Sequence, residues 1–146
     1  MQDEFESPEQ SEGDDAQQEL LLTPRAEIWA LFAISGKDLN PDYLTHDLGM
    51  EPDRIVHADP TQDTHGVWQI NSSLGVYEPF ERHAMEILER LIPVRRQLRD
   101  LSRGARLEFY AVIQKKSHDT SLFEIPPRLL LFMGYIGANL ALEVTD

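Results

Sequence analysis

At 146 residues the chain is long enough for a single domain with a sizeable core, because domains of about 100–150 residues bury roughly two-thirds of their unfolded surface. It contains no cysteine, which excludes disulfides, thiolate nucleophiles and cysteine-ligated zinc. Its formal net charge of -13 argues against nucleic acid as the main partner, because binding a phosphate backbone requires a basic surface.

Residues 1–22 are polar and acidic, and we predict that they form a disordered tail before a single α+β domain over residues 23–146. Every charged side chain in this tail is a carboxylate. The tail would either keep the protein soluble or dock on a basic surface of this chain or of another. The N-terminus lacks the basic and apolar regions of a secretory signal, and no apolar run reaches the roughly 20 residues of a membrane span. We therefore expect a cytoplasmic protein that does not bind membranes.

Residues 26–35 predict the central strand of a sheet. Alternate side chains of a strand point to opposite faces, and here both sets are apolar. One set is Ile28, Ala30, Phe32 and Ile34, and the other is Trp29, Leu31 and Ala33. We expect this strand to be covered on both faces or to be paired in an assembly.

A short helix is predicted next, over residues 41–48. Asn40 can cap its first amides, and Pro41 is suited to the first helical position. Leu44 and Leu48 share one face, and Gly49 suits the left-handed position that ends a helix. Strands are predicted at 54–57 and 66–71, on either side of the polar loop 58–65.

Residues 81–103 predict the longest helix, because apolar side chains recur at three- and four-residue spacing. Pro93 should kink it or divide it into two stacked pieces. Strands at 107–114 and 122–125, a helix at 126–136 and a strand at 139–144 complete the order. The predicted fold is a ferredoxin-like βαββαβ sandwich of the α+β class, extended by a further βαβ, in two or three layers.

Four short motifs occur in an order and spacing that are similar to a known bacterial family. They lie at residues 32–41, 48–54, 66–68 and 91–95. Over residues 26–144 the chain resembles domain of unknown function 4279. The resemblance implies a link to suspected immunity proteins, because some members of such families are found near polymorphic toxin genes. No catalytic residues are established for that family, so the resemblance implies none here.

Two histidines and two carboxylates stand at the ends of the loop 58–65, namely His57, Asp59, Asp63 and His65. Imidazole and carboxylate groups suit a divalent metal or acid/base chemistry, provided that the loop folds the two pairs together. The alternative is an ordinary exposed loop, because the spacing matches no known ligand pattern.

Basic side chains recur at helical spacing in the second half of the long predicted helix: Arg95, Arg96, Arg99 and Arg103. Cations near a helix C-terminus are favoured by the helix dipole and can pair with nearby acids. They would alternatively bind an anion or an acidic segment, and we hypothesise that the acidic tail folds back on them.

Trp29, Trp68, Phe109 and Tyr110 are interpreted as core residues. Trp68 would instead anchor a protein partner if it lay on an open sheet face beside Tyr77 and Phe80.

The remaining histidines, among them His83, are isolated in the sequence and are interpreted as surface or helix-face residues. The pair Ser72-Ser73 lacks the strand-turn-helix elbow of a nucleophilic serine, so hydrolase chemistry is not favoured.

Together these features favour a non-enzymatic, cytoplasmic protein-interaction domain with no cofactor. In its most specific form it would be an immunity protein that blocks a basic toxin domain, because an acidic inhibitor associates quickly with a basic enzyme. The alternative functions are a small-ligand or metal-binding domain, or an enzyme, that uses the loop from His57 to His65, and a structural or assembly role as a dimer.

Overall fold

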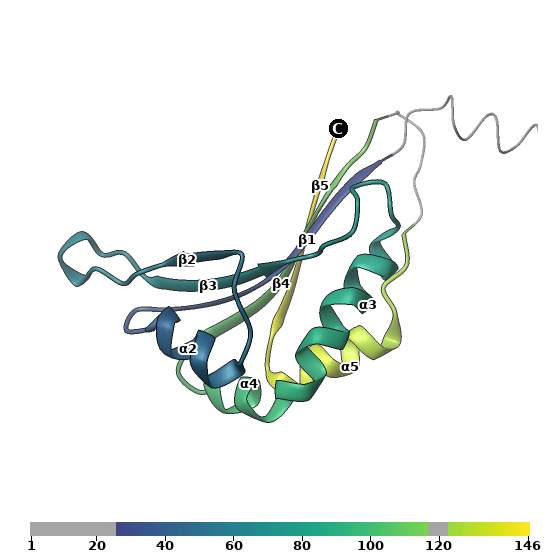
Figure 1. Cartoon of the computed structure of the whole chain (residues 1–146). Helices are drawn as coiled ribbons and strands as arrows, with labels where there is room; N and C mark the ends of the chain where they lie inside the picture. The colour runs from purple at the N-terminus through teal and green to yellow at the C-terminus, as the bar shows by residue number, and fades with distance from the viewer. Residues whose placement is uncertain (1–25, 117–122) are drawn as a thin grey trace, which may run out of the picture.

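The computed structural model describes residues 26–116 and 123–146 of the chain (Figure 1). Five strands form one sheet with the order β2-β3-β1-β4-β5. The strands are β1 (Glu27–Gly36), β2 (Arg54–Val56), β3 (Gly66–Asn71), β4 (Arg106–Gln114) and β5 (Asn139–Thr145). The helices are α2 (Pro41–Leu48), η1 (Pro60–Gln62), α3 (Phe80–Leu91), η2 (Ile92–Val94), α4 (Arg95–Leu101) and α5 (Pro127–Ile136).

The sheet confirms the predicted fold class. Strand β1 runs antiparallel to both β3 and β4, and β2 runs antiparallel to β3. The first four strands therefore have the order and directions of a ferredoxin-like βαββαβ unit. Helix α5 then leads from β4 to β5, which pairs with β4 in parallel and supplies the further βαβ.

The helices α2, α3, α4 and α5 cover the same face of the sheet (Figure 1). The crossover from β1 to β2 leads toward the β2 edge of the sheet. The crossovers from β3 to β4 and from β4 to β5 lead toward the β5 edge. Because β3 and β4 also run opposite to β1, right-handed crossovers place every helix on one side. The domain is therefore a two-layer sandwich, in which helices cover one sheet face.

The expectation that β1 is covered on both faces is wrong. Ile28 and Phe32 are buried beneath the helices, whereas Trp29 is 43% exposed. Leu31 and Ala33, which share the face of Trp29, are only half-buried. An antiparallel sheet can leave one face toward solvent, and this one does so even though the open face is apolar at β1.

Local signals place most of the helices where they were predicted. The Asn40 side chain accepts hydrogen bonds from the amides of Asp42 (3.1 Å) and Tyr43 (3.3 Å), and Gly49 ends α2 with a φ of 62°. The long predicted helix is divided into α3 and α4 by the 3-10 turn η2, which contains Pro93.

The strand predicted at 122–125 is wrong for residues 123–125, and Leu122 lies outside the described residues. Both edges of β4 are already paired with β1 and β5, so β4 cannot accept another strand. Phe123 instead packs edge-on against Phe80 of α3, with ring centroids 5.9 Å apart.

The predicted acidic tail, residues 1–22, also lies outside the described part of the chain. Within residues 26–116 and 123–146, no helix combines the length and the apolar character that crossing a membrane requires.

Candidate functional site

The carboxylates of the loop 58–65 shape the loop itself. Asp59 caps the short helix η1, because its Oδ1 accepts hydrogen bonds from the amide (3.1 Å) and the hydroxyl (2.6 Å) of Thr61. Asp59 also forms an isolated antiparallel bridge with Thr64. Asp63 has a φ of 52° and ends the turn. The Asp59 carboxylate is therefore explained by local structure, and Asp63 contributes to the turn through its backbone.

The predicted metal or acid/base cluster does not form at this loop. The Nε2 atom of His57 lies 2.9 Å from Oδ2 of Asp42 on α2, so its contact is with another element and not with Asp59. Both side chains of this pair are exposed. Within the described ranges, which include all of residues 57–65, no three His, Asp or Glu side chains are grouped as metal ligands.

Trp68 is also not a partner anchor. Its side chain is fully buried at 0% exposure, and its indole Nε1 donates to the hydroxyl of Thr45 on α2, 3.2 Å away. Trp68 lies on the sheet face that the helices cover, which is why it belongs to the core. Tyr77 is 58% exposed beside β1, where its hydroxyl donates to Glu27 at 3.4 Å.

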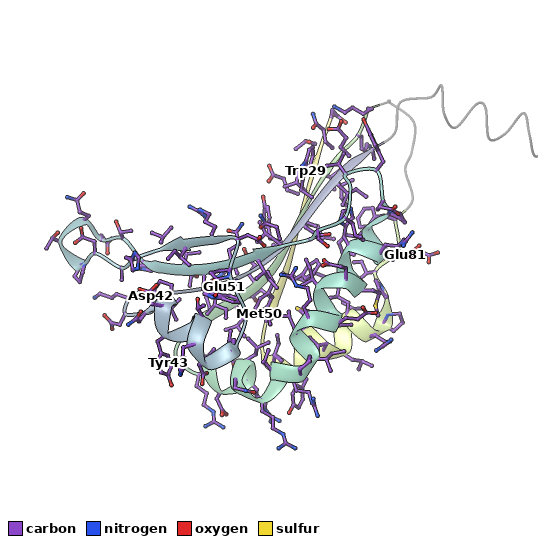
Figure 2. The ribbon with its side chains drawn as sticks, in the orientation of Figure 1. Trp29, Asp42, Tyr43, Met50, Glu51 and Glu81 are labelled. Carbon is purple, nitrogen blue, oxygen red and sulfur yellow. The ribbon has the colours of Figure 1, made fainter. Side chains whose placement is uncertain are left out.

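The exposed tryptophan is Trp29, which lies on the sheet face opposite to α2, α3, α4 and α5 (Figure 2). We call the apolar centre of that face the open sheet face; it consists of Trp29, Leu31, Ala33, Val67, Tyr110, Val112 and Ala141. Each of the last six is half-buried. The sequence interpretation that placed Trp29 and Tyr110 in the core is therefore wrong, whereas it is confirmed for Trp68 and Phe109. The sequence signal for this face is the apolar set Trp29, Leu31 and Ala33 of β1, which was expected to lie beneath a covering layer.

Charged groups around the open sheet face bond within the chain. Arg106 pairs with Glu108 (2.8 Å), and Lys116 pairs with Glu27 (3.5 Å). The hydroxyl of Tyr110 donates to the carboxylate of Glu143, and this hydrogen bond raises the pKa of Tyr110. The face therefore presents an apolar centre whose neighbouring charges are already satisfied.

A second surface feature lies between α5 and the end of α3, where a groove encloses about 520 Å³. We call it the arginine groove; its lining is Leu88, Ile92, Arg95, Arg96, Arg128, Leu131, Phe132 and Tyr135. The guanidinium of Arg99 lies over the Tyr135 ring, 4.9 Å from its centroid, at the end of the groove.

The four arginines that recur at helical spacing thus lie in two different parts of the surface. Arg95 and Arg96 line the groove, Arg99 adjoins it through Tyr135, and Arg103 lines a separate open concavity with Ser35 and His65. Arg128 of α5 joins the groove from a distant part of the chain, which helical spacing on one element could not reveal.

Ser72 and His83 form a buried pair that the sequence analysis missed. The Ser72 hydroxyl lies 2.6 Å from Nδ1 of His83, whose side chain is 1% exposed. Burial lowers the pKa of His83; the backbone and carboxylate of Glu78 oppose this shift without forming a normal hydrogen bond to the ring. The spacing of His83 from Ile87, which lies on the apolar face of α3, was the available signal.

The Ser72–His83 pair resembles part of a catalytic triad only in residue type. Nε2 of His83 has no hydrogen-bond partner among the described residues, so no carboxylate orients the ring. Ser72 also accepts a hydrogen bond from the amide of Leu74 (3.2 Å) and donates its own amide to Ala30 (2.8 Å). The pair therefore fastens the segment after β3 to both β1 and α3.

Comparison with known proteins adds one finding. The family model described as Domain of unknown function (DUF4279) matches residues 26–146. No curated protein sequence and no solved structure matches the chain.

Proposed function

The chain belongs to the family Domain of unknown function (DUF4279), and from that premise we propose that it is a non-enzymatic, cytoplasmic protein-interaction domain that binds a basic protein through its open sheet face. The family description names no activity, so the proposal depends on the surface of the molecule.

The observation that carries the proposal is the exposure of Trp29. It is 43% exposed on the sheet face that also carries Leu31 and Val112, whereas Phe32 on the other side of the same strand is 0% exposed. Apolar side chains that gather on an exposed surface are typical of an interaction site. Tryptophan is enriched among the residues that contribute most binding energy when an interface covers them.

The charge of the chain supports a basic partner. A net charge of -13 attracts a positively charged protein over distance and so speeds association. The charged groups beside the open sheet face are bonded within the chain, so the partner's apolar surface can pack on the centre without leaving them unpaired. In its most specific form the partner is a toxin domain whose active-site cleft this face occupies.

Trp29→Ser tests the proposal, with Tyr43→Ser as the matched control. Tyr43 is an aromatic residue with 60% exposure on α2, on the helical side of the sheet (Figure 2). The native chain and the Tyr43→Ser variant should capture the same basic protein, and titration should show at least about 30-fold weaker binding for Trp29→Ser. Equal affinity for Trp29→Ser would contradict the proposal.

Sedimentation at several concentrations tests whether a second copy of the chain, and not a basic protein, binds to the open sheet face. The native chain should remain monomeric in the absence of its partner, because its net charge opposes self-association. A dimer that is lost in Trp29→Ser but kept in Tyr43→Ser would replace the basic partner with a second copy.

The loop from His57 to His65 is not favoured as a ligand or metal site. The His57 side chain contacts Asp42 and the Asp59 side chain contacts Thr61, and no three potential ligands are grouped among the described residues.

A further inference from the structure

We propose that the arginine groove binds the acidic N-terminal segment of its own chain, residues 3–22. This binding surface is distinct from the open sheet face.

The groove combines two kinds of surface that suit an acidic segment with apolar residues. Leu88 and Ile92 contribute the apolar side from α3 and η2, and Leu131 faces them from α5, where it is 74% exposed. Such exposure is costly for a leucine unless another surface covers it. The guanidinium groups of Arg95, Arg96 and Arg128 lie at the same groove and offer donors to carboxylates.

The arginines on α3 have acidic partners, in contrast to the arginines at the groove. On α3, Arg82 pairs with Glu78 (3.2 Å) and Arg90 pairs with Glu86 (3.4 Å). The groove arginines form no salt bridge with any residue that the structure describes. Arg95 donates only to the backbone carbonyl of Ile92, at 3.0 Å. The groove therefore carries concentrated positive charge in a chain that is acidic overall.

The N-terminal segment has the complementary chemistry. Its charged residues are all carboxylates: Asp3, Glu4, Glu6, Glu9, Glu12, Asp14, Asp15 and Glu19. Leu20, Leu21 and Leu22 follow directly and can cover the apolar side of the groove. An acidic run joined to an apolar run matches a groove that has arginines beside exposed leucine.

The segment is longer than the helix that leads to the groove. An extended chain spans about 3.3 Å per residue, so the stretch from Asp15 to Ala26 can cover about 36 Å. Helix α3 has 12 residues and is therefore about 18 Å long. Because the segment is tethered, its effective concentration at the groove is in the millimolar range, and weak individual contacts suffice to populate the bound state.

A spin label tests this proposal in the full chain. The protein contains no cysteine, so Gln17→Cys provides a single attachment site for a nitroxide beside the acidic run. In the isotope-labelled chain, the nitroxide should broaden the amide signals of Ile92, Leu131 and Phe132. Signals from Asp47 and Thr61, on other elements, should remain sharp. Absence of broadening at the groove would overturn the proposal.

Charge reversal separates specific docking from general attraction. Arg96→Glu combined with Arg128→Glu should abolish the broadening. Lys37→Glu combined with Arg54→Glu makes the same change of charge at exposed positions elsewhere and should preserve it. Unchanged amide shifts for Phe32 and Trp68 would verify the fold of both variants. Equal loss of broadening in both would overturn the proposal by showing that net charge alone determines contact.

A mixing experiment distinguishes the chain's own segment from that of a second copy. Spin-labelled chain without isotopes is mixed with isotope-labelled chain without the spin label. We expect no broadening in the mixture, because the segment acts within its own chain. Broadening in the mixture as strong as in the chain that carries both the nitroxide and the isotopes would overturn the intramolecular proposal. The binding tests with Trp29→Ser address a different surface, so either proposal can fail without the other.

Discussion

The two faces of β1 have similar apolar residues but different surroundings. Ile28, Phe32 and Ile34 are buried beneath the helices, while Trp29 and Leu31 on the opposite side reach solvent. An apolar pattern shows that a face can be buried, but the number of layers is decided by where the crossover helices pack. Because every described crossover places its helix on one side, the second apolar face of β1 stays uncovered by α2, α3, α4 and α5.

The largest expected effect contrasts two neighbouring residues of β1. Phe32→Ala should lower the free energy of unfolding by about 3–5 kcal/mol, because it leaves a cavity under the helices. Leu31→Ala on the open sheet face should lower it by about 1 kcal/mol or less. Urea unfolding of both variants measures the difference. Similar losses would show that the open face is as tightly packed as the covered one.

A smaller expected effect is the pH dependence of stability that arises from His83, beneath the covered side of the sheet. The pKa of His83 is lowered in the folded protein, so the unfolded chain binds a proton more readily. The contribution of the neutral His83 ring to stability is fully present at pH values above its pKa in the unfolded chain, about 6.5. It is lost as the pH falls from that value through the lower pKa of His83 in the folded protein.

His83→Gln tests this linkage. Between pH 7.5 and pH 5, the unfolding free energy of the native protein should fall more steeply than that of the variant. The slopes are compared, since the substitution itself changes the absolute stability. Parallel slopes would show that His83 does not contribute to the pH dependence.

The last comparison measures the solvent exposure of the two faces and not their stability. The chain has two tryptophans, so each can be observed alone. Trp29→Phe leaves the buried Trp68, whose fluorescence should resist quenching by acrylamide, whereas Trp68→Phe leaves the exposed Trp29, which should be quenched readily. Equal quenching would contradict the difference between the two faces. Binding of a partner to the open sheet face should protect Trp29 from quenching.

Local chemistry made several elements predictable. The capping side chain of Asn40 and the left-handed Gly49 define α2 through contacts within a few residues. Pro93 divides the long helix at the turn where its missing amide requires a break. Alternation and helical spacing likewise indicated the strands of the ferredoxin-like unit.

The candidate sites were less predictable, because they combine distant residues. Ser72 and His83 come from different elements, and Arg128 joins Arg95 and Arg96 only after α5 packs beside α3 and α4. The sequence interpretation places both tryptophans in the core, which is confirmed for Trp68 and wrong for Trp29. Alternation identifies which side chains share a face, but not which face the helices cover.

The sequence by itself determined most of the secondary structure, the acidic charge and the two apolar faces of β1, because these depend on residue type and on spacing over a few positions. Only the tertiary structure decided that one face stays open, that Trp29 is exposed, and that a groove collects arginines from α4 and α5. It also decided that Gly66 must lack a side chain, because a Cβ atom there would collide with the backbone carbonyl of Leu39. The physical reason is that coverage, exposure and collision depend on crossover packing between elements that are distant in the chain.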